Sequence, residues 1–155
     1  EGKKNKEEGK REIVITVTSK EKYNPFAFLK LDNFKKKLCE LKFDITNNAY
    51  GTLHYIDLNL TGFDDRGRVV RKYGAVPHIN YKGRSRIPLV LGSTIRNVGS
   101  AVFKEECKYL TELRFDGIDE DSCVMRMLPE NVSCSEFTIL KSNVPSLKIK
   151  NGAKK

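Results

Sequence analysis

The sequence predicts an α+β fold: a mainly antiparallel sheet with one or two packed helices. Residues 12–18, EIVITVT, are dense in β-branched side chains, and several later segments alternate apolar and polar residues as half-buried strands do. Residues 33–41, NFKKKLCEL, instead place apolar residues at helical spacing behind Asp32, a favourable N-cap residue. Because the strands follow one another in runs, the order of elements favours α+β over alternating α/β.

The first two elements are expected to be a strand and a helix. Ile13, Ile15 and Val17 share one face of the strand at 12–18, and residues 19–26 should end it. In the segment 33–41, Phe34, Leu38 and Leu41 fall at i, i+4 and i+7. This spacing predicts a short amphipathic helix that packs on the sheet and exposes its lysines.

Residues 51–62, GTLHYIDLNLTG, are expected to form one half-buried strand. One face carries His54, Ile56, Leu58 and Leu60, and the other carries Leu53, Tyr55, Asp57 and Asn59, so His54 is interpreted as a core or edge histidine. FDDRGR at 63–68 has the composition of a turn, so residues 68–76 should pair back as the second strand of a hairpin.

Further strands are expected in the second half of the chain. Pro88 pushes the short apolar segment 87–91 toward a sheet edge. Residues 92–106 indicate loop and turn, and residues 134–141 fit a short helix or a strand. Strands are predicted in 107–118, in 123–128 and near the C-terminal end within 142–155.

The length of 155 residues indicates a single globular domain, here placed at 12–150. Residues 1–11, EGKKNKEEGKR, contain no apolar side chain and should form a disordered basic arm, and residues 151–155 form a basic tail. No apolar run approaches the roughly 18 residues that a membrane span needs.

The four cysteines, Cys39, Cys107, Cys123 and Cys134, are scattered along the chain. None belongs to a C-x-x-C pair, and His54 and His78 lie far from them, so a zinc site is not expected. The spacing favours free thiols in a reducing cytosol. No metal ion or cofactor is predicted, and the sequons that begin at Asn59 and Asn131 are interpreted as chance matches.

Positive charge is concentrated in the middle of the chain, whose formal net charge is +9. Residues 66–104 contain no aspartate or glutamate but many lysines and arginines. Such a segment predicts a contact surface for an anionic partner, either an anionic membrane or nucleic acid, with a solvated basic face as the alternative. Tyr73 and Tyr81 could stack bases, but no RNP motif or G-x-x-G clamp accompanies them, so only non-specific nucleic-acid contact is expected.

The residues predicted to bind membrane or nucleocapsid share a positive charge and a position in the arm or in the basic segment. They are Lys3, Lys4, Lys6, Lys10, Arg11, Arg66, Arg68, Arg71, Lys72, Lys82, Arg84 and Arg86.

The common catalytic motifs are missing, so the chain is not expected to be an enzyme. A rival hypothesis is a small enzyme built from His54, His78, Asp57 and Cys107. The acidic stretch 116–121, with Asp116, Asp119, Glu120 and Asp121, is expected to be a solvated turn. It could also meet the basic face of a neighbouring copy, and head-to-tail contacts of this kind generate open polymers.

The order of these features, with YGAVPHINYKGRSRIP at 73–88 and YLTELRFDGIDEDS at 109–122, resembles rhabdovirus matrix proteins of plant-infecting or vesiculovirus-like type. The resemblance implies a non-catalytic, matrix-like virion protein that self-associates and links the viral nucleocapsid to the inner face of a membrane. It implies a location in the virion, the host cytoplasm and the membrane inner face, with the nucleus as a further site. The family's P-P-x-Y and P-T/S-A-P budding motifs are missing. The alternative function is a viral movement or silencing protein that binds single-stranded nucleic acid.

Overall fold

The computed structural model describes residues 11–23, 37–71, 89–96, 100–119, 123–126 and 133–151. Within these ranges the chain forms twelve strands in three sheets, and helical structure is limited to two short turns, η2 (Cys107–Tyr109) and α2 (Cys134–Phe137). The expected α+β class is therefore wrong for this part of the chain, because no described helix is long enough to pack on a sheet. The protein is mainly β.

The largest sheet is built around two long antiparallel strands, β1 (Ile13–Tyr23) and β2 (Lys37–Asn47), which pair over their full length. Strand β11 (Thr138–Ser142) adds to β1 in parallel. On its other side β2 pairs with β7 (Thr94–Ile95) and β8 (Ser100–Phe103), both antiparallel.

Two smaller sheets complete the fold. One has the order β12-β9-β4-β5, with β4 (Asn59–Asp64) and β9 (Leu110–Gly117) antiparallel at its centre, β5 (Val69–Val70) at one side and β12 (Lys148–Asn151) at the other. The other has the order β10-β3-β6, from β3 (Thr52–Ile56), β6 (Leu89–Val90) and β10 (Cys123–Arg126).

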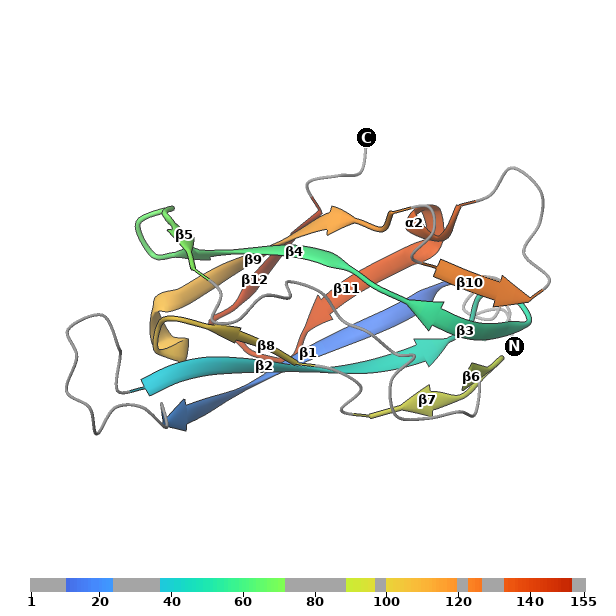
Figure 1. The fold of residues 1–155 in the computed structure, drawn as a ribbon, viewed down its shortest axis with the longest axis horizontal. Coiled ribbons are helices and arrows are strands. Elements are labelled where there is room, and N and C mark those ends of the chain that lie inside the picture. Colours follow the sequence, from blue (N-terminus) through green and yellow to red (C-terminus); the bar gives the residue numbers. More distant parts are fainter. Residues whose placement is uncertain are drawn as a thin grey trace, which may run out of the picture.

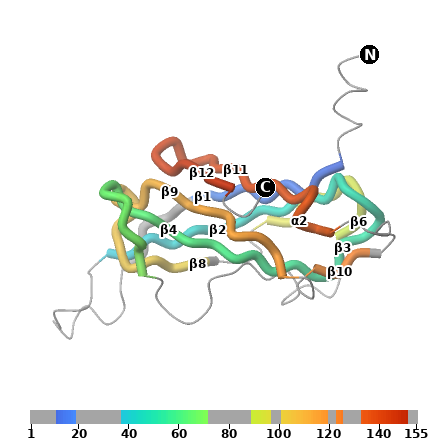
Figure 2. Tube along the Cα trace, turned by 90° about the horizontal axis from the view of Figure 1, so that it is seen from above, coloured from blue at the N-terminus to red at the C-terminus, as the bar shows by residue number. Residues whose placement is uncertain are grey.

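The sheets enclose one core between their inner faces, and the two views show the long strands stretched along one axis (Figures 1 and 2). Gly62 of β4 marks the closest approach, since a Cβ there would lie 2.7 Å from the Phe103 ring of β8. Between the large sheet and the β4/β9 sheet, one side is bridged by the chain passing from β11 to β12. The other is linked by a hydrogen bond from the Lys104 N–H to the Arg71 carbonyl, 2.8 Å.

The helix expected at 33–41 is replaced, from Lys37 onward, by strand β2. Residues 33–36 lie outside the described part of the chain. Leu38 and Leu41 are buried as expected, but so are Cys39, Phe43 and Ile45. An alternation of period two that continues to Ile45 buries more apolar area in a strand than the three helically spaced side chains could in a helix.

The single strand expected at 51–62 is divided into β3 and β4, which belong to different sheets. Leu53 and Ile56 are both buried, so the alternation changes phase between them, opposite a register shift at Val124 and Met125 of β10. The phase change leaves His54 half-exposed instead of facing the core.

Most of the other predicted elements are confirmed. Ile13, Ile15 and Val17 of β1 are fully buried, although β1 continues through the expected break to Tyr23. Residues 134–141 combine both predicted alternatives, a helical turn followed by strand β11. The prediction of loop and turn at 92–106 is wrong in part, because residues 94–95 and 100–103 pair with β2 as the strands β7 and β8 of the large sheet.

The expectation of free thiols is also wrong, since the four cysteines form two disulfides, Cys39–Cys107 and Cys123–Cys134. Their Cα atoms are 4.6 and 6.3 Å apart, within the usual range for a bridge. The strand β2 places Cys39 opposite Phe103 of β8, four residues before Cys107, so the pairing of distant strands brings the sulfur atoms together.

Candidate functional site

The β4–β5 hairpin is shaped by the carboxylate of Asp64. Asp64 Oδ1 accepts hydrogen bonds from the backbone N–H groups of Arg66 and Arg68, at 2.9 and 2.8 Å. Asp64 Oδ2 accepts from Arg68 Nε at 2.9 Å, and the side chain of Asp64 is only 9% exposed. Gly67 has a φ of +78°, a left-handed conformation that glycine adopts without a steric penalty. The turn is therefore held from inside by one carboxylate.

These bonds change the acidity of Asp64. The hydrogen bond from the Arg68 N–H, helped by those from the Arg66 N–H and the Arg68 guanidinium, holds the pKa of Asp64 below its ordinary value of 3.8, although partial burial acts in the opposite direction. The charge of Asp64 is thus stabilised in the fold, and Arg68 is committed to it.

Arg66 and Arg71 remain exposed, and among the described residues no carboxylate pairs with either. Beside the hairpin lies η2, and the two enclose a hollow of about 250 Å³. Its lining residues are Asp64, Asp65, Arg66, Arg68, Glu105 and Tyr109. The hollow therefore combines cationic and anionic side chains with one aromatic ring.

Arg11, the last residue of the predicted arm, lies near the opposite end of the molecule, where the chain enters β1 (Figure 1). Its guanidinium donates a hydrogen bond of 2.9 Å to the Ala49 carbonyl and stands 5.0 Å from the centre of the Tyr50 ring. Tyr50 in turn packs edge-on against Phe137 of α2, with ring centres 5.3 Å apart. Arg11 thus helps to fix the start of β1, and its predicted role in binding stays a prediction.

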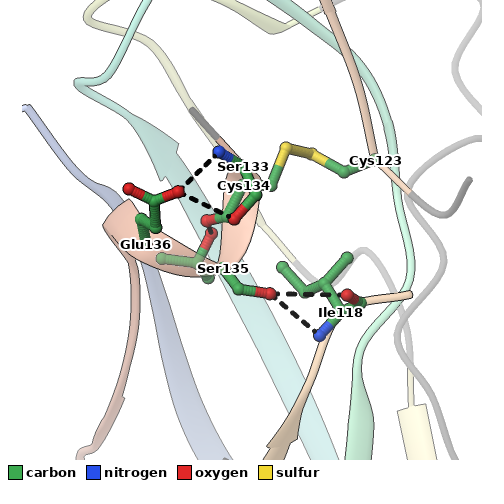
Figure 3. Close-up of a disulfide and its surroundings, with 7 residues drawn as sticks. Ile118, Cys123, Ser133, Cys134, Ser135 and Glu136 are labelled. Atoms are coloured by element: carbon green, nitrogen blue, oxygen red, sulfur yellow. Dashed lines mark hydrogen bonds between the residues drawn. A yellow bond between two sulfur atoms is a disulfide. The ribbon is translucent and has the colours of Figure 1, made fainter. Parts of the chain in front are cut away.

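The same end is braced by the Cys123–Cys134 disulfide, which ties β10 to α2 (Figure 3). The Glu136 carboxylate accepts hydrogen bonds from the N–H and hydroxyl of Ser133, at 2.9 and 3.2 Å. The Ser135 hydroxyl accepts from the Ile118 N–H at 3.2 Å and lies 3.4 Å from the Ile118 carbonyl. These contacts secure a helix of one turn that could not persist alone.

The predicted site residues are only partly described. Arg66 and Arg68 lie in the turn between β4 and β5, Arg71 directly follows β5, and Arg11 lies just before β1. The remaining predicted residues lie outside the described part of the chain: Lys3, Lys4, Lys6, Lys10, Lys72, Lys82, Arg84 and Arg86. Neither the role of Asp64 as the carboxylate that organises the turn nor the place of Tyr109 beside it was predicted from the sequence. The turn sequence DDRG was the available signal for Asp64, since aspartate often accepts backbone N–H bonds in turns.

The rival enzyme site loses its nucleophile, because Cys107 is bonded to Cys39. Asp57 accepts a hydrogen bond from the Tyr55 hydroxyl, and this bond raises the pKa of Tyr55. His78 lies outside the described residues. Within the described ranges no cluster of three His, Cys, Asp or Glu side chains is placed to hold a metal ion, and no helix is long and apolar enough to span a membrane.

The acidic turn is bonded within the chain where it is described. Asp116 accepts hydrogen bonds from the Thr61 hydroxyl and from Arg114 Nε, both at 2.5 Å. Asp119 accepts a longer bond from the Asn59 amide, at 3.4 Å. Glu120 and Asp121 lie outside the described residues. Asp116 therefore balances Arg114 on its own sheet.

Comparison of the chain with protein family models, with curated proteins and with solved structures found no match. The resemblance to rhabdovirus matrix proteins thus gains no support, and the viral function stays a prediction.

Proposed function

We propose that this chain is a non-catalytic binding module that works in an oxidising compartment and holds an anionic partner at the β4–β5 hairpin. The proposal depends on one observation, which is that the arginines of the hairpin differ in the contacts that they make. Arg68 neutralises Asp64 and rigidifies the turn, whereas Arg66 and Arg71 stay exposed. Because Asp64 fixes the backbone that carries Arg66, the turn itself loses little entropy when an anion binds.

The compartment follows from the disulfides. Disulfides persist in oxidising environments such as the bacterial periplasm, the endoplasmic reticulum or the cell exterior, and they are rare in the cytosol. Cys39 is 1% exposed and Cys134 is 5% exposed, so these sulfur atoms are integral to the core.

The viral matrix function remains a second candidate, with its partners as predicted: the nucleocapsid, an anionic membrane and further copies of the chain. It is favoured by the positions of the start of β1 and the β4–β5 hairpin at opposite ends of the long axis, which suit head-to-tail association (Figure 1). The two disulfides oppose it, because a protein at the inner face of a membrane meets the reducing cytosol.

The test compares two double variants with the same loss of positive charge. Arg66→Gln with Arg71→Gln removes the proposed contact, and Lys141→Gln with Lys148→Gln removes two exposed lysines on β11 and β12. Binding to inorganic polyphosphate and to phosphatidylglycerol vesicles is measured at several salt concentrations.

The hairpin variant should bind at least about tenfold more weakly and show a shallower salt dependence, while the lysine variant changes little. Equal losses in the two variants would show that net charge alone drives binding. The proposal would also be overturned if the unaltered protein bound neither polyphosphate nor the vesicles. Salt-sensitive self-association that depends on vesicles would favour the matrix candidate.

A further inference from the structure

The hollow between the hairpin and η2 is lined by cationic, anionic and aromatic side chains, so it can select a ligand by more than its charge. One wall is the hairpin, whose shape is set by Asp64. The opposite wall is η2, which the Cys39–Cys107 disulfide ties to β2. The hollow is therefore formed by two segments that are each fixed independently, and its shape should persist in solution.

The charges around the hollow are mixed. Once Asp64 and Arg68 neutralise each other, the hairpin wall still contains Arg66 together with the exposed carboxylate of Asp65. A ligand made only of closely spaced anionic groups would meet repulsion from that carboxylate. A suitable ligand combines one anionic group for Arg66 with hydroxyl donors for a carboxylate such as Asp65.

Tyr109 adds a flat aromatic wall. Its side chain is 40% exposed although it lines the hollow, and the Lys108 ammonium lies 5.0 Å from its ring centre. The face of an aromatic ring carries partial negative charge and attracts the slightly positive C–H groups of a ligand ring. A volume of about 250 Å³ is below the roughly 300–1,000 Å³ of pockets for drug-sized molecules, so one small ring would fill it.

We infer that the hollow binds a uronic-acid residue of an acidic saccharide, and this inference rests on the anion-binding function proposed above. The sugar carboxylate would contact the Arg66 guanidinium, the sugar ring would lie on Tyr109, and its hydroxyls would donate to Asp65. The rest of the saccharide chain would pass over Arg71. The hollow thus distinguishes a sugar acid from other anions by requiring charge, hydroxyl donors and a C–H face in one ligand.

The experiment uses the full chain and three probes: an oligogalacturonate, its neutral methyl ester and inorganic polyphosphate. Tyr109→Ala removes the aromatic wall, and Tyr109→Phe keeps the ring as the matched control. Dissociation constants are measured at fixed salt, and the backbone N–H signal of Gly67 is followed by NMR during titration.

We expect Tyr109→Ala to weaken oligogalacturonate binding about tenfold and to leave polyphosphate binding unchanged, while Tyr109→Phe stays within about threefold of the unaltered protein. The methyl ester should bind poorly because it lacks the charge for Arg66. Equal loss of both anionic probes in Tyr109→Ala, or no loss in either, would overturn the saccharide site. If polyphosphate binding still depends on Arg66 and Arg71, the anion-binding function survives that result. If it does not, both proposals fail.

Discussion

At the end where the chain enters β1, Arg11 is bonded to the Ala49 carbonyl and to the face of Tyr50, whereas at the hairpin end Arg66 extends into solvent beside a carboxylate already occupied by Arg68. Each end also has its own disulfide, Cys123–Cys134 at the first and Cys39–Cys107 at the second. Arg11 and Arg68 make contacts that hold local structure, whereas no described residue bonds to the Arg66 side chain, and the proposed function assigns anion binding to it.

The two disulfides should contribute unequally to stability. Cys39–Cys107 closes a loop of 68 residues and Cys123–Cys134 one of 11. Loop-closure entropy predicts a loss of about 4 kcal/mol for Cys39→Ala with Cys107→Ala, and about 3 kcal/mol for Cys123→Ala with Cys134→Ala. Urea denaturation of the two double variants measures the difference. A larger loss from the shorter loop would show that the α2 end, not the hairpin end, limits stability.

The hydrogen bonds of the Asp64 carboxylate predict that the stability of the hairpin turn decreases in acid. Because the folded state lowers the pKa of Asp64 below 3.8, the stability it contributes is fully present above that value and is lost as pH falls through the lowered pKa. Asp64→Asn keeps an oxygen that can accept backbone N–H bonds but removes the charge that Arg68 neutralises. Denaturation of the variant should therefore respond less to pH below about 4 than that of the unaltered protein. The matched control is Asp65→Asn, at an exposed position on the same turn.

Local signals allowed β1 and the hairpin to be predicted. Alternating Ile13, Ile15 and Val17 and the turn sequence DDRG each act over a few residues, and the structure contains both elements. The strand β2 was missed because Leu38 and Leu41 fit a helical spacing, and only the alternation of Cys39, Leu41, Phe43 and Ile45 identifies the segment as a strand.

The disulfides could not be read from spacing, because they depend on which strands pair. The register of Cys39 against Phe103 is a tertiary result. The candidate site was predicted only in part, because its contacts also depend on tertiary structure. The sequence identified Arg66 and Arg68 as cations of one turn, but it could not say which of them the Asp64 carboxylate would bind. Tyr109 reaches the hollow only because η2 folds against the hairpin.

The capping contact at α2 should have a smaller effect than either disulfide. Glu136→Ala removes the acceptor for the Ser133 N–H and hydroxyl, and the loss of such a contact at a helix N-terminus costs about 1 kcal/mol. Polyphosphate binding should be unchanged because the hairpin lies at the other end. The measurement combines thermal unfolding with the binding assay. Reduced binding in this variant would mean that the two ends are coupled.

The smallest effects are expected from two single substitutions, one at Arg11 and one at Arg66. Arg11→Gln should lower the free energy of unfolding by about 1 kcal/mol, because it loses the bond to the Ala49 carbonyl and the contact with Tyr50, and should leave anion binding nearly intact. Arg66→Gln should do the reverse, since no described residue bonds to that side chain. Urea denaturation and polyphosphate titration of both variants give four measurements. If the two substitutions weakened binding equally, Arg11 would belong to the contact surface as the sequence predicted, and the assignment of binding to the hairpin end would be wrong.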